Sequence, residues 1–350
     1  MSGRVALIGY GLAGEAFHAP LIAAEPGLEL AAVVTRDPQR RARAIERQPG
    51  VELLDGADDV WARAGDFDLV VVASPNATHV RFARAAIDAG LDVVVDKPLA
   101  ASAAEAEALA AHAQARGRLL IPFHNRRWDG DFLTLQRLIE LGALGEVARY
   151  ESRFERWRPA VHESWRERAE PEEVGGLLYD LGVHLIDQAL VLFGPAEHVY
   201  AELDARRANA KVDDDVFVAI THANGVRSHV WATMLGGHLA PRLRVLGTAA
   251  SFVKDGLDVQ EAQLRDGLRP GDPAFGVEDS VAWGALHAGD ETQAIETEPG
   301  RYAGFYAGVV TALRGGALPV TPEDAVAALR VIDAARASAI EGRRVTLAAI

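Results

Sequence analysis

The feature that most constrains the fold is a repeated alternation in the first third of the chain. Short apolar runs, bounded by glycine, proline or polar residues, alternate with amphipathic stretches that suit helices. The runs cover residues 4–9, 28–35, 69–73, 92–95 and 119–122, and the helical stretches cover residues 12–24, 38–48, 78–89 and 102–116. Nearly continuous apolar strands are typical of a parallel sheet covered by helices on both faces. The sequence therefore predicts an α/β domain over residues 1–122.

After residue 122 the pattern changes to that of a second domain. Residues 199–206, 215–222 and 227–235 predict successive antiparallel strands, and Asn224-Gly225 suits a hairpin turn between the last two. A half-exposed strand is expected at residues 146–156 and short strands at residues 243–246 and 250–253. Helices are expected at residues 132–141, 182–193, 302–314 and 322–341, and a long loop region at residues 265–300. Residues 123–350 are predicted to form an α+β domain built on an open, mostly antiparallel sheet.

Charge and composition exclude several classes of function. The formal net charge is −14, so the chain repels nucleic-acid backbones and no nucleic-acid partner is expected. A small anionic ligand in one local basic pocket is compatible with that charge. The chain has no cysteine, which excludes disulfides and thiolate metal sites.

The apolar runs also bear on location. None approaches the roughly 18 residues of a membrane span, so no membrane partner is expected. The first apolar stretch, residues 5–8, is too short for the apolar core of a signal peptide and leads directly into glycine. The cytoplasm is therefore the expected location.

A glycine-rich loop follows the first predicted strand. Gly9-Tyr10-Gly11-Leu12-Ala13-Gly14 is a G-x-G-x-x-G sequence between a strand and a helix, which is the context of a dinucleotide-binding loop. Its glycines would allow a tight turn, the approach of a pyrophosphate to the backbone, and close packing of the helix on the strand. The alternative is a turn whose glycines are incidental.

The end of the second predicted strand selects the form of the cofactor. NAD enzymes usually place an acidic residue there, about 20 residues after the loop, to bind the ribose 2′-hydroxyl. This chain has Thr35-Arg36 at that place, with Asp37 in the following turn. The Arg36 guanidinium suits the 2′-phosphate of NADP, so we expect NADP(H). NAD(H) is the alternative if Arg36 only stacks on the adenine.

Lys97 is one of three lysines in the chain and lies where the fourth predicted strand ends, in Asp96-Lys97-Pro98. Open α/β sheets bind ligands at the carboxyl ends of their strands. A lysine partly removed from water there can change its pKa and join in proton transfer. The alternative is a surface lysine paired with Asp96.

A second candidate site lies in a predicted helix, where Asp180, His184 and Asp187 follow one another at spacings of four and three. These spacings place the three side chains on one face of a helix. A carboxylate beside an imidazole orients the ring and favours its protonated form, which suits proton exchange with an alcohol. The alternatives are a structural histidine and a metal site, although no thiolate or further ligand supports the metal.

Arginines and aromatic residues cluster in three other segments. Residues 124–129 follow the fifth predicted strand, and residues 153–159 and 165–168 come later. They could line a polyol pocket, with Asn125 and Arg127 bonding hydroxyl groups and aromatic rings covering C–H faces. For residues 153–168 a strand edge or a subunit interface is the favoured interpretation.

Three of these motifs together resemble the glucose–fructose oxidoreductase and inositol dehydrogenase (Gfo/Idh/MocA) family. They are the loop Gly9–Gly14, Asp96-Lys97-Pro98, and Gly176-x3-Asp180-x-Gly182-x-His184-x2-Asp187. The NADP-dependent scyllo-inositol dehydrogenase-like branch is also similar in Phe17-His18-x-Pro20-Leu21 and in residues 124–133 and 178–182. The resemblance covers nearly the whole chain and implies an N-terminal Rossmann domain. The family has Glu-Lys-Pro where this chain has Asp96-Lys97-Pro98, so the carboxylate is one methylene shorter.

The resemblance also implies roles for individual residues. Lys97, Asp180 and His184 would be catalytic. The cofactor-binding residues would be Gly9, Tyr10, Gly11, Leu12, Ala13, Gly14, Thr35, Arg36, Ser74, Pro75, Asn76, His79, Asp96 and Lys97. The substrate-binding residues would be Asn125, Arg127, Trp128, Tyr179 and His184. No metal is implied.

The expected function is hydride transfer between NADP(H) and a secondary alcohol or ketone of a cyclic polyol or sugar. One alternative is a glycosidase that oxidises and then reduces its substrate with a tightly bound NAD. The other is a cofactor-binding regulator without catalysis, against which the presence of Lys97, Asp180 and His184 counts.

The predicted antiparallel sheet also suggests self-association. Val216, Val218, Ile220, Val230 and Trp231 would give it an apolar open face. Monomeric proteins rarely expose large apolar patches. We therefore expect a homodimer or homotetramer that forms through this sheet.

Overall fold

A computed structural model describes residues 2–161, 167 and 173–347. The chain forms two compact units, and neither is one continuous segment. The first unit comprises Met1–Trp128, Val259–Gly276 and Arg301–Val326, and the second comprises Asp129–Asp258, Val277–Gly300 and Ala327–Ile350. Over the described part of the chain, no helix is both long and apolar enough to cross a membrane.

The first unit contains a six-stranded parallel sheet with the strand order β3-β2-β1-β4-β5-β6. Its strands are β1 (Gly3–Ile8), β2 (Leu28–Val34), β3 (Glu52–Leu54), β4 (Leu69–Val72), β5 (Asp92–Asp96) and β6 (Leu120–Phe123). This confirms the predicted Rossmann-like domain, since the order reverses beside β1 as in doubly wound folds. Strand β3 was not predicted, because it has three residues and only Leu54 is buried.

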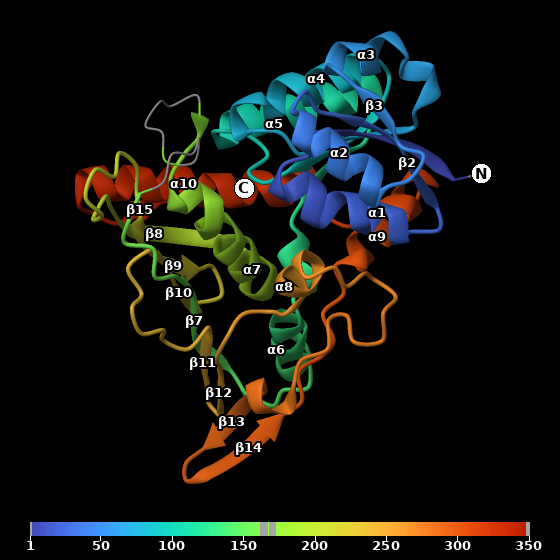
Figure 1. Cartoon of the computed structure of the whole chain (residues 1–350). Coiled ribbons are helices and arrows are strands. Elements are labelled where there is room, and N and C mark those ends of the chain that lie inside the picture. The colour runs from blue at the N-terminus through green and yellow to red at the C-terminus, as the bar shows by residue number, and fades with distance from the viewer. Residues whose placement is uncertain (1, 162–166, 168–172, 348–350) are drawn as a thin grey trace. The chain divides into compact units, whose positions relative to one another are not determined.

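Helices cover both faces of this sheet (Figure 1). The described helices of this unit are η1 (Ala13–His18), α1 (Ala19–Ala24), α2 (Pro38–Arg47), α3 (Ala57–Ala62), α4 (His79–Asp88), α5 (Ala103–Arg116), α8 (Gln260–Arg265) and α9 (Ala303–Leu313), with short 3₁₀ turns η2 (Ala64–Asp66), η3 (Asn76–Thr78) and η4 (Asn125–Trp128). Both ends of α5 are capped. Ser102 accepts a hydrogen bond from the Glu105 N–H, and Gly117 ends the helix in the left-handed conformation (φ 61°).

The hydrophobic core of the first unit is completed by residues from far along the chain. Tyr302, Phe305 and Tyr306 are fully buried in the same cluster as side chains of β1, β2 and β4. Phe305 meets the ring of Phe123 edge-on, with 4.8 Å between ring centroids. The unit therefore extends beyond residue 122 and takes in two later segments, because their side chains fill its core.

A buried histidine in this core makes the stability of the protein depend on pH. His18 has no exposed surface, its Nδ1 lies 2.7 Å from Tyr306 Oη, and burial lowers its pKa to about 4. The unfolded chain takes up a proton near pH 6.5, whereas the folded chain resists this until about pH 4. The contribution of His18 to the free energy of unfolding should therefore fall as the pH drops through that window, by about 2 kcal/mol at pH 5 relative to pH 7.

Urea unfolding at the two pH values measures this effect. His18→Gln should reduce the pH-dependent loss of stability by about 2 kcal/mol, and His287→Gln, which removes a partly exposed histidine of the other unit, should not. An unchanged loss in His18→Gln would contradict the assignment.

The second unit contains a nine-stranded sheet with the order β14-β13-β12-β11-β7-β10-β9-β8-β15. Its strands are β7 (Val147–Glu155), β8 (Ala196–Asp204), β9 (Asp215–His222), β10 (Arg227–Thr233), β11 (Leu243–Gly247), β12 (Ser251–Lys254), β13 (Gly284–Ala288), β14 (Glu291–Ile295) and β15 (Val345–Thr346). Only the β7–β10 pair is parallel, so the predicted mostly antiparallel sheet is confirmed.

The prediction of a loop over residues 265–300 was wrong for its second half. Strands β13 and β14 pair there as a hairpin. Four of the five residues of β14 are exposed, so the segment lacks the apolar alternation by which a strand is identified in a sequence. A short 3₁₀ turn, η8 (Ser280–Ala282), precedes the hairpin.

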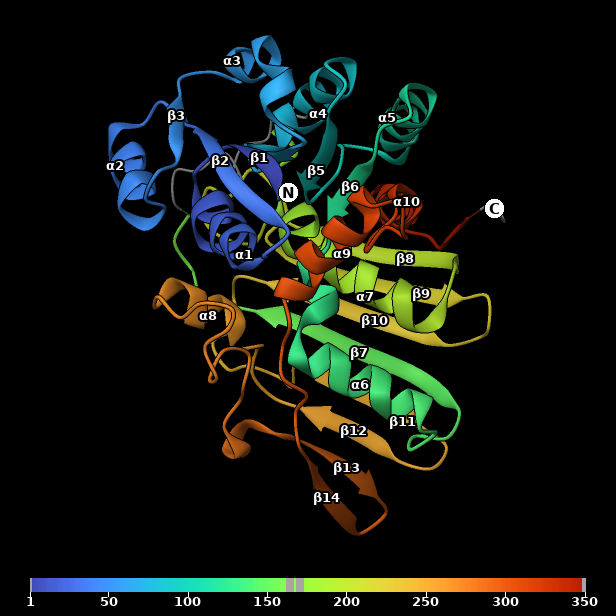
Figure 2. The same cartoon turned by 90° about the vertical axis from the view of Figure 1, so that its right-hand side faces the viewer.

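Figure 2 shows helices α6 (Gly130–Glu140) and α7 (Val183–Phe193) along one face of this sheet. A π-helical turn, η7 (Leu178–Gly182), leads into α7, and the long helix α10 (Pro322–Glu341) begins in the first unit and continues in the second. Among the described helices of the second unit, the two views show none on the opposite face of this sheet (Figures 1 and 2).

Four of the five residues predicted to give the sheet an apolar open face do not lie on that face. Val216, Val218, Ile220 and Val230 are each at most 2% exposed and belong to the face under the helices. Side chains alternate along a strand, so the opposite face carries their neighbours. These are Phe217, Ala219, His229 and Trp231, with the Arg153 guanidinium 4.0 Å from the Trp231 ring centroid. Of the five predicted residues, Trp231 alone lies on the open face, because an alternating pattern does not reveal which side the helices cover.

Candidate functional site

In the glycine loop between β1 and η1, the presence of each of the three glycines is explained by a different feature of its surroundings. Gly9 has a φ of +101°, and a Cβ there would collide with the carbonyl of Ala73. A Cβ on Gly14 would collide with the carbonyl oxygen of Gly9, so this glycine lets the helix pack on the strand. Gly11 differs from both, because the nearest atom to its Cβ would be Arg40 Nη1 at 3.7 Å.

The geometry of Gly11 fits a bound dinucleotide. The protein itself leaves room for a side chain at Gly11, so packing does not require glycine there. The neighbouring Leu12 is 49% exposed, although leucine is usually buried. A glycine that packing does not demand is expected where a pyrophosphate approaches the backbone, and the loop therefore fits a dinucleotide.

The end of β2 carries two arginines beside this loop. Thr35 is buried, and Arg36 donates from Nε to the Asp55 carbonyl at 2.9 Å. Asp37 caps α2 by accepting the Arg40 N–H at 3.0 Å, and that hydrogen bond lowers its pKa. Neither Arg36 nor Arg40 forms an ion pair with any residue in the described part of the chain. The two guanidiniums leave positive charge beside the glycine loop.

The loops after β4 and β5 are joined by a buried histidine. Both ring nitrogens of His79 lie within hydrogen-bond distance of carbonyl oxygens, Nδ1 at 2.8 Å from Pro98 and Nε2 at 2.9 Å from Ser74. Asp96 accepts the Lys97 N–H at 2.8 Å. Lys97 therefore lies at the carboxyl end of β5, on a loop that is tied to the loop after β4. Pro75 and Asn76 belong to the loop after β4.

The predicted substrate residues of η4 have contacts inside the first unit. Asn125 is 5% exposed, and Arg127 forms an ion pair with Asp324 at 3.1 Å. The Trp128 ring packs edge-on against Phe305, with 5.7 Å between ring centroids. A Cβ on Gly304 would lie 2.6 Å from Trp128 Nε1. The Trp128 ring is therefore part of the packing inside the first unit.

In the second unit, Asp180 and His184 lie on adjacent turns of one helical segment, η7 and α7. The segment begins where the Leu178 N–H donates to Asp213 Oδ2 at 2.7 Å. A Cβ on Gly176, which has a φ of +98°, would collide with the Asp213 carboxylate, so glycine is required in this motif. Asp180 is half-buried, and His184 is 5% exposed with its ring edge-on to Phe154. Both π-helical turns of the described chain, η1 and η7, coincide with candidate sites, as such turns often do.

The other predicted residues of this segment are buried as well. Tyr179 is 6% exposed, and the Arg336 guanidinium lies 5.7 Å from its ring centroid. Asp187 is 2% exposed. Among the described residues, no group of three or more His, Asp or Glu side chains is placed to hold a metal ion.

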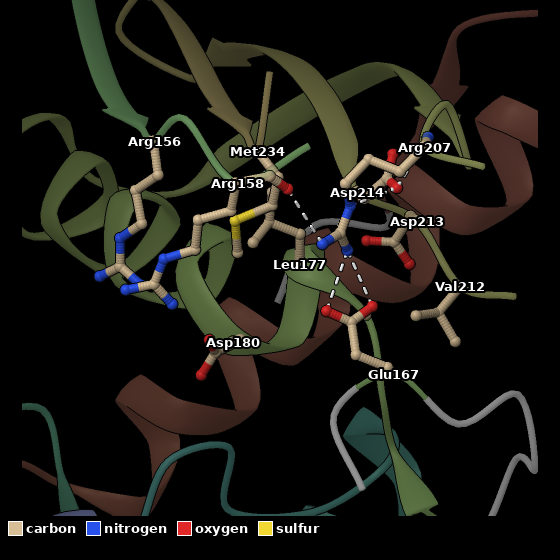
Figure 3. Close-up of a pocket in the computed structure, with 11 residues that line it drawn as sticks. Arg156, Arg158, Glu167, Leu177, Asp180, Arg207, Val212, Asp213, Asp214 and Met234 are labelled. Carbon is tan, nitrogen blue, oxygen red and sulfur yellow. Dashed lines mark hydrogen bonds and ion pairs between the residues drawn. The ribbon is translucent and has the colours of Figure 1, made fainter. Parts of the chain in front are cut away.

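Asp180 also lines a cavity of about 170 Å³ that the sequence did not predict (Figure 3). Its lining is strongly charged and comprises Arg156, Arg158, Glu167, Gly176, Leu177, Asp180, Arg207, Val212, Asp213, Asp214 and Met234. These residues come from segments that are distant in sequence, which is why no local motif indicated the cavity. The third arginine-rich segment, Trp165–Arg168, lies outside the described residues apart from Glu167.

Comparisons with known proteins agree with this architecture. The model of the oxidoreductase family's NAD-binding Rossmann fold matches residues 3–124, and the model of the family's C-terminal alpha/beta domain matches residues 136–347. The chain is 34% identical to the scyllo-inositol 2-dehydrogenase (NADP(+)) IolW of Bacillus subtilis, with 98% of this chain and 96% of IolW covered. It is 40% identical to the uncharacterized oxidoreductase YdgJ of Escherichia coli, over 94% of each chain. Among solved structures, yvaA of Bacillus subtilis superposes with a TM-score of 0.92 at 33% identity, covering 99% of this chain and 100% of yvaA.

Proposed function

Because the chain belongs to the Gfo/Idh/MocA oxidoreductase family, we propose that it transfers hydride between NADP(H) and a secondary alcohol or ketone of a cyclic polyol or sugar. The observation that carries the proposal is Gly11, a loop glycine that packing within the protein does not require. The inositol dehydrogenase IolW, which is similar over nearly the whole chain, supports this substrate class.

Three side chains have distinct tasks in the proposed reaction. The bound nicotinamide supplies or accepts the hydride. His184 exchanges the proton of the reacting hydroxyl, as an imidazole can near neutral pH. Lys97 donates a hydrogen bond to the reacting oxygen and stabilises negative charge there, while Asp180, which lies on the same helical segment as His184, orients and tunes that imidazole.

The preference for NADP rests on the charges beside the glycine loop. Arg36 and Arg40 supply positive charge, and the one nearby carboxylate in sequence, Asp37, is used to cap α2. A guanidinium binds a phosphate well and has no acceptor for a ribose hydroxyl. The name of IolW includes NADP(+), which agrees with this preference.

A fluorescence titration with NADPH and NADH tests the cofactor assignment. We expect NADPH to bind more tightly, and Arg36→Ala to weaken NADPH by roughly 10-fold or more while leaving NADH unchanged. Gly11→Ala should weaken both cofactors at an unchanged melting temperature, because the added methyl meets no protein atom closely.

Arg118→Ala is the matched control for Arg36→Ala, since Arg118 lies at the opposite edge of the same sheet, near Asp92. Equal affinity of the wild-type protein for NADPH and NADH would refute the preference for NADP. The same protein is then tested with inosose, keto-sugar and aldose substrates. A cofactor that remains bound with no net change of its redox state would favour the glycosidase alternative.

The open face of the second unit's sheet is proposed to bind a second copy of the chain. The patch comprises Phe217, His229 and Trp231, whose rings contact one another, together with Arg153. A homodimer or homotetramer through this face should give a multiple of 37.4 kDa in light scattering. Trp231→Glu should shift the mass toward the monomer, and a wild-type monomer at micromolar concentration would refute the proposal.

A further inference from the structure

We infer that Asp213 is a positioning residue in the proposed reaction, because it fixes the start of the helical segment that carries Asp180 and His184. The inference rests on the proposed function and adds to it a residue that need not touch the substrate. Asp213 lies 35 residues after Leu178, the first residue of η7, and both belong to the second unit. Asp213 and Asp180 line the same cavity, which Figure 3 shows.

The helical segment has no polar cap of its own. Leu177 occupies its N-cap position, and a leucine side chain offers no hydrogen-bond acceptor. The first N–H groups of a helix have no partner within it, and a buried N–H without a partner destabilises the fold. Asp213 supplies two acceptors: its carbonyl oxygen accepts the Leu177 N–H at 2.9 Å, and its Oδ2 accepts the Leu178 N–H at 2.7 Å. Both leucines are at most 3% exposed, so one distant residue pairs two successive buried amides.

The Asp213 carboxylate also shapes the chain just before the helix. Gly176 has a φ of +98°, and a Cβ there would collide with this carboxylate. The Gly176 carbonyl in turn accepts the Asp180 N–H at 3.1 Å. A displacement at Asp213 would therefore reach Asp180 through Gly176, and Asp180 is the residue proposed to orient His184.

A carboxylate suits this position electrostatically. A helix N-terminus carries partial positive charge, which favours a negative group there. Burial raises the pKa of Asp213, whereas its hydrogen bond from the Leu178 N–H and the positive charge of Arg336 lower it. The Arg336 guanidinium also lies 5.7 Å from the Tyr179 ring centroid. The same arginine therefore interacts with Asp213 and with the first turn of the helix.

Asp213 is itself held in place by its neighbour in the chain. Asp214 accepts the backbone N–H groups of Arg206 and Arg207 at 2.7 and 3.1 Å, and it accepts the Arg207 Nε–H at 2.8 Å. The Asp214 N–H donates to the Asp204 carbonyl at 2.9 Å. A residue that positions others must have a fixed conformation of its own. These hydrogen bonds anchor the main chain beside Asp213, so its carboxylate has a defined place.

Steady-state kinetics with the carbonyl substrate identified among the inosose, keto-sugar and aldose compounds test the inference. Asp213→Ala should lower kcat by about 10- to 100-fold at an unchanged KM, because a displacement of about 1 Å can cost that much. NADPH affinity should not change, because the glycine loop belongs to the first unit. Asp213→Asn keeps an oxygen that can accept the Leu178 N–H, so its kcat should stay within about 3-fold of wild type.

Asp258→Ala is the matched control. Asp258 Oδ2 accepts the N–H of Gly130, the first residue of α6, at 2.7 Å. Both alanine variants therefore remove an aspartate that holds the start of a helix in the second unit, but α6 carries none of the residues proposed for the reaction. Asp258→Ala should lower the melting temperature and leave kcat within about 3-fold of wild type.

Hydrogen exchange followed by mass spectrometry needs no cofactor or substrate. In Asp213→Ala, exchange should rise in peptides that cover residues 176–184, and in Asp258→Ala it should not rise there. Gly176→Ala should raise the same exchange, but by less when Asp213→Ala is also present, because the colliding carboxylate is then gone.

Three results would overturn the inference: unchanged exchange in Asp213→Ala, raised exchange with kcat within about 3-fold of wild type, or an equal loss of kcat in Asp258→Ala. If the wild-type protein reduces none of the carbonyl compounds, the proposed function fails. The exchange of Asp213→Ala then still shows whether this residue holds the helix, so the two failures are distinguishable.

Discussion

His184→Ala should lower kcat by about 10²- to 10⁴-fold, the usual contribution of a positioned acid or base. NADPH affinity should stay unchanged, because the glycine loop and Arg36 belong to the first unit and His184 to the second. The measurement is steady-state turnover with the carbonyl substrate identified among the inosose, keto-sugar and aldose compounds, combined with the NADPH titration. A pH profile adds a second readout, since loss of the group that exchanges the proton should remove one limb of the profile.

His222→Gln is the control for this substitution. His222 is another fully buried histidine of the second unit, and its ring nitrogens contact the Gly194 carbonyl and the Ser228 hydroxyl, both at 2.8 Å. Its replacement should change the melting temperature and leave kcat within about 3-fold of wild type, a range that corresponds to less than 1 kcal/mol. Full turnover in His184→Ala would remove His184 from the mechanism.

Arg242→Met should cost about 3–5 kcal/mol of folding free energy, because it leaves a buried carboxylate without its partner. The Arg242 side chain is 2% exposed, and its Nε lies 3.4 Å from Asp131 Oδ2, which is 1% exposed. The guanidinium also donates to Ser152 and to Gln188 of α7, and it lies 4.3 Å from the Phe154 ring centroid. The measurement is urea unfolding at pH 7.

Two further variants separate burial from charge in this prediction. Asp131→Asn/Arg242→Met should recover part of the loss, since the neutral asparagine removes the buried charge that Arg242→Met leaves unpaired. Arg244→Met should cost less than about 1 kcal/mol, because Arg244 is 46% exposed in its ion pair with Glu151. If Arg242→Met and Arg244→Met had equal effects, the buried pair would not be the cause.

The first unit could be predicted closely from its sequence because its strands are buried on both faces. Continuous runs such as Leu69–Val72 have every residue buried, so the sequence pattern and the structure carry the same information. Strand β3, with one buried residue, gave no such pattern. The alternating strands of the second unit were predicted as strands, but four of the five apolar residues expected on the open face lie on the other face, because the face under α6 and α7 depends on contacts between distant residues.

The same distinction holds for the candidate site: some of its residues can be recognised from short sequence segments, and others are brought together only by contacts between distant segments. The glycine loop, Lys97 and the helix from Asp180 to Asp187 are short segments whose residue types and spacing indicate chemistry on their own. Arg207 and Asp213 gave no local signal, because their partners Glu167 and Leu178 lie 40 and 35 residues away in the sequence. Residues 153–168 were interpreted as a strand edge or a subunit interface, so the cavity that Arg156 and Arg158 line was not predicted.

The discontinuity of the two units has a consequence for synthesis on the ribosome. The chain passes from one unit to the other at five points, so no single cut separates them. Residues 1–128 are translated well before Tyr302, Phe305 and Tyr306, and at roughly 5–20 residues per second this interval lasts roughly 10–30 seconds. During that time the nascent sheet lacks side chains that complete its core. The protein should therefore be most prone to aggregation and most dependent on chaperones while it is being made.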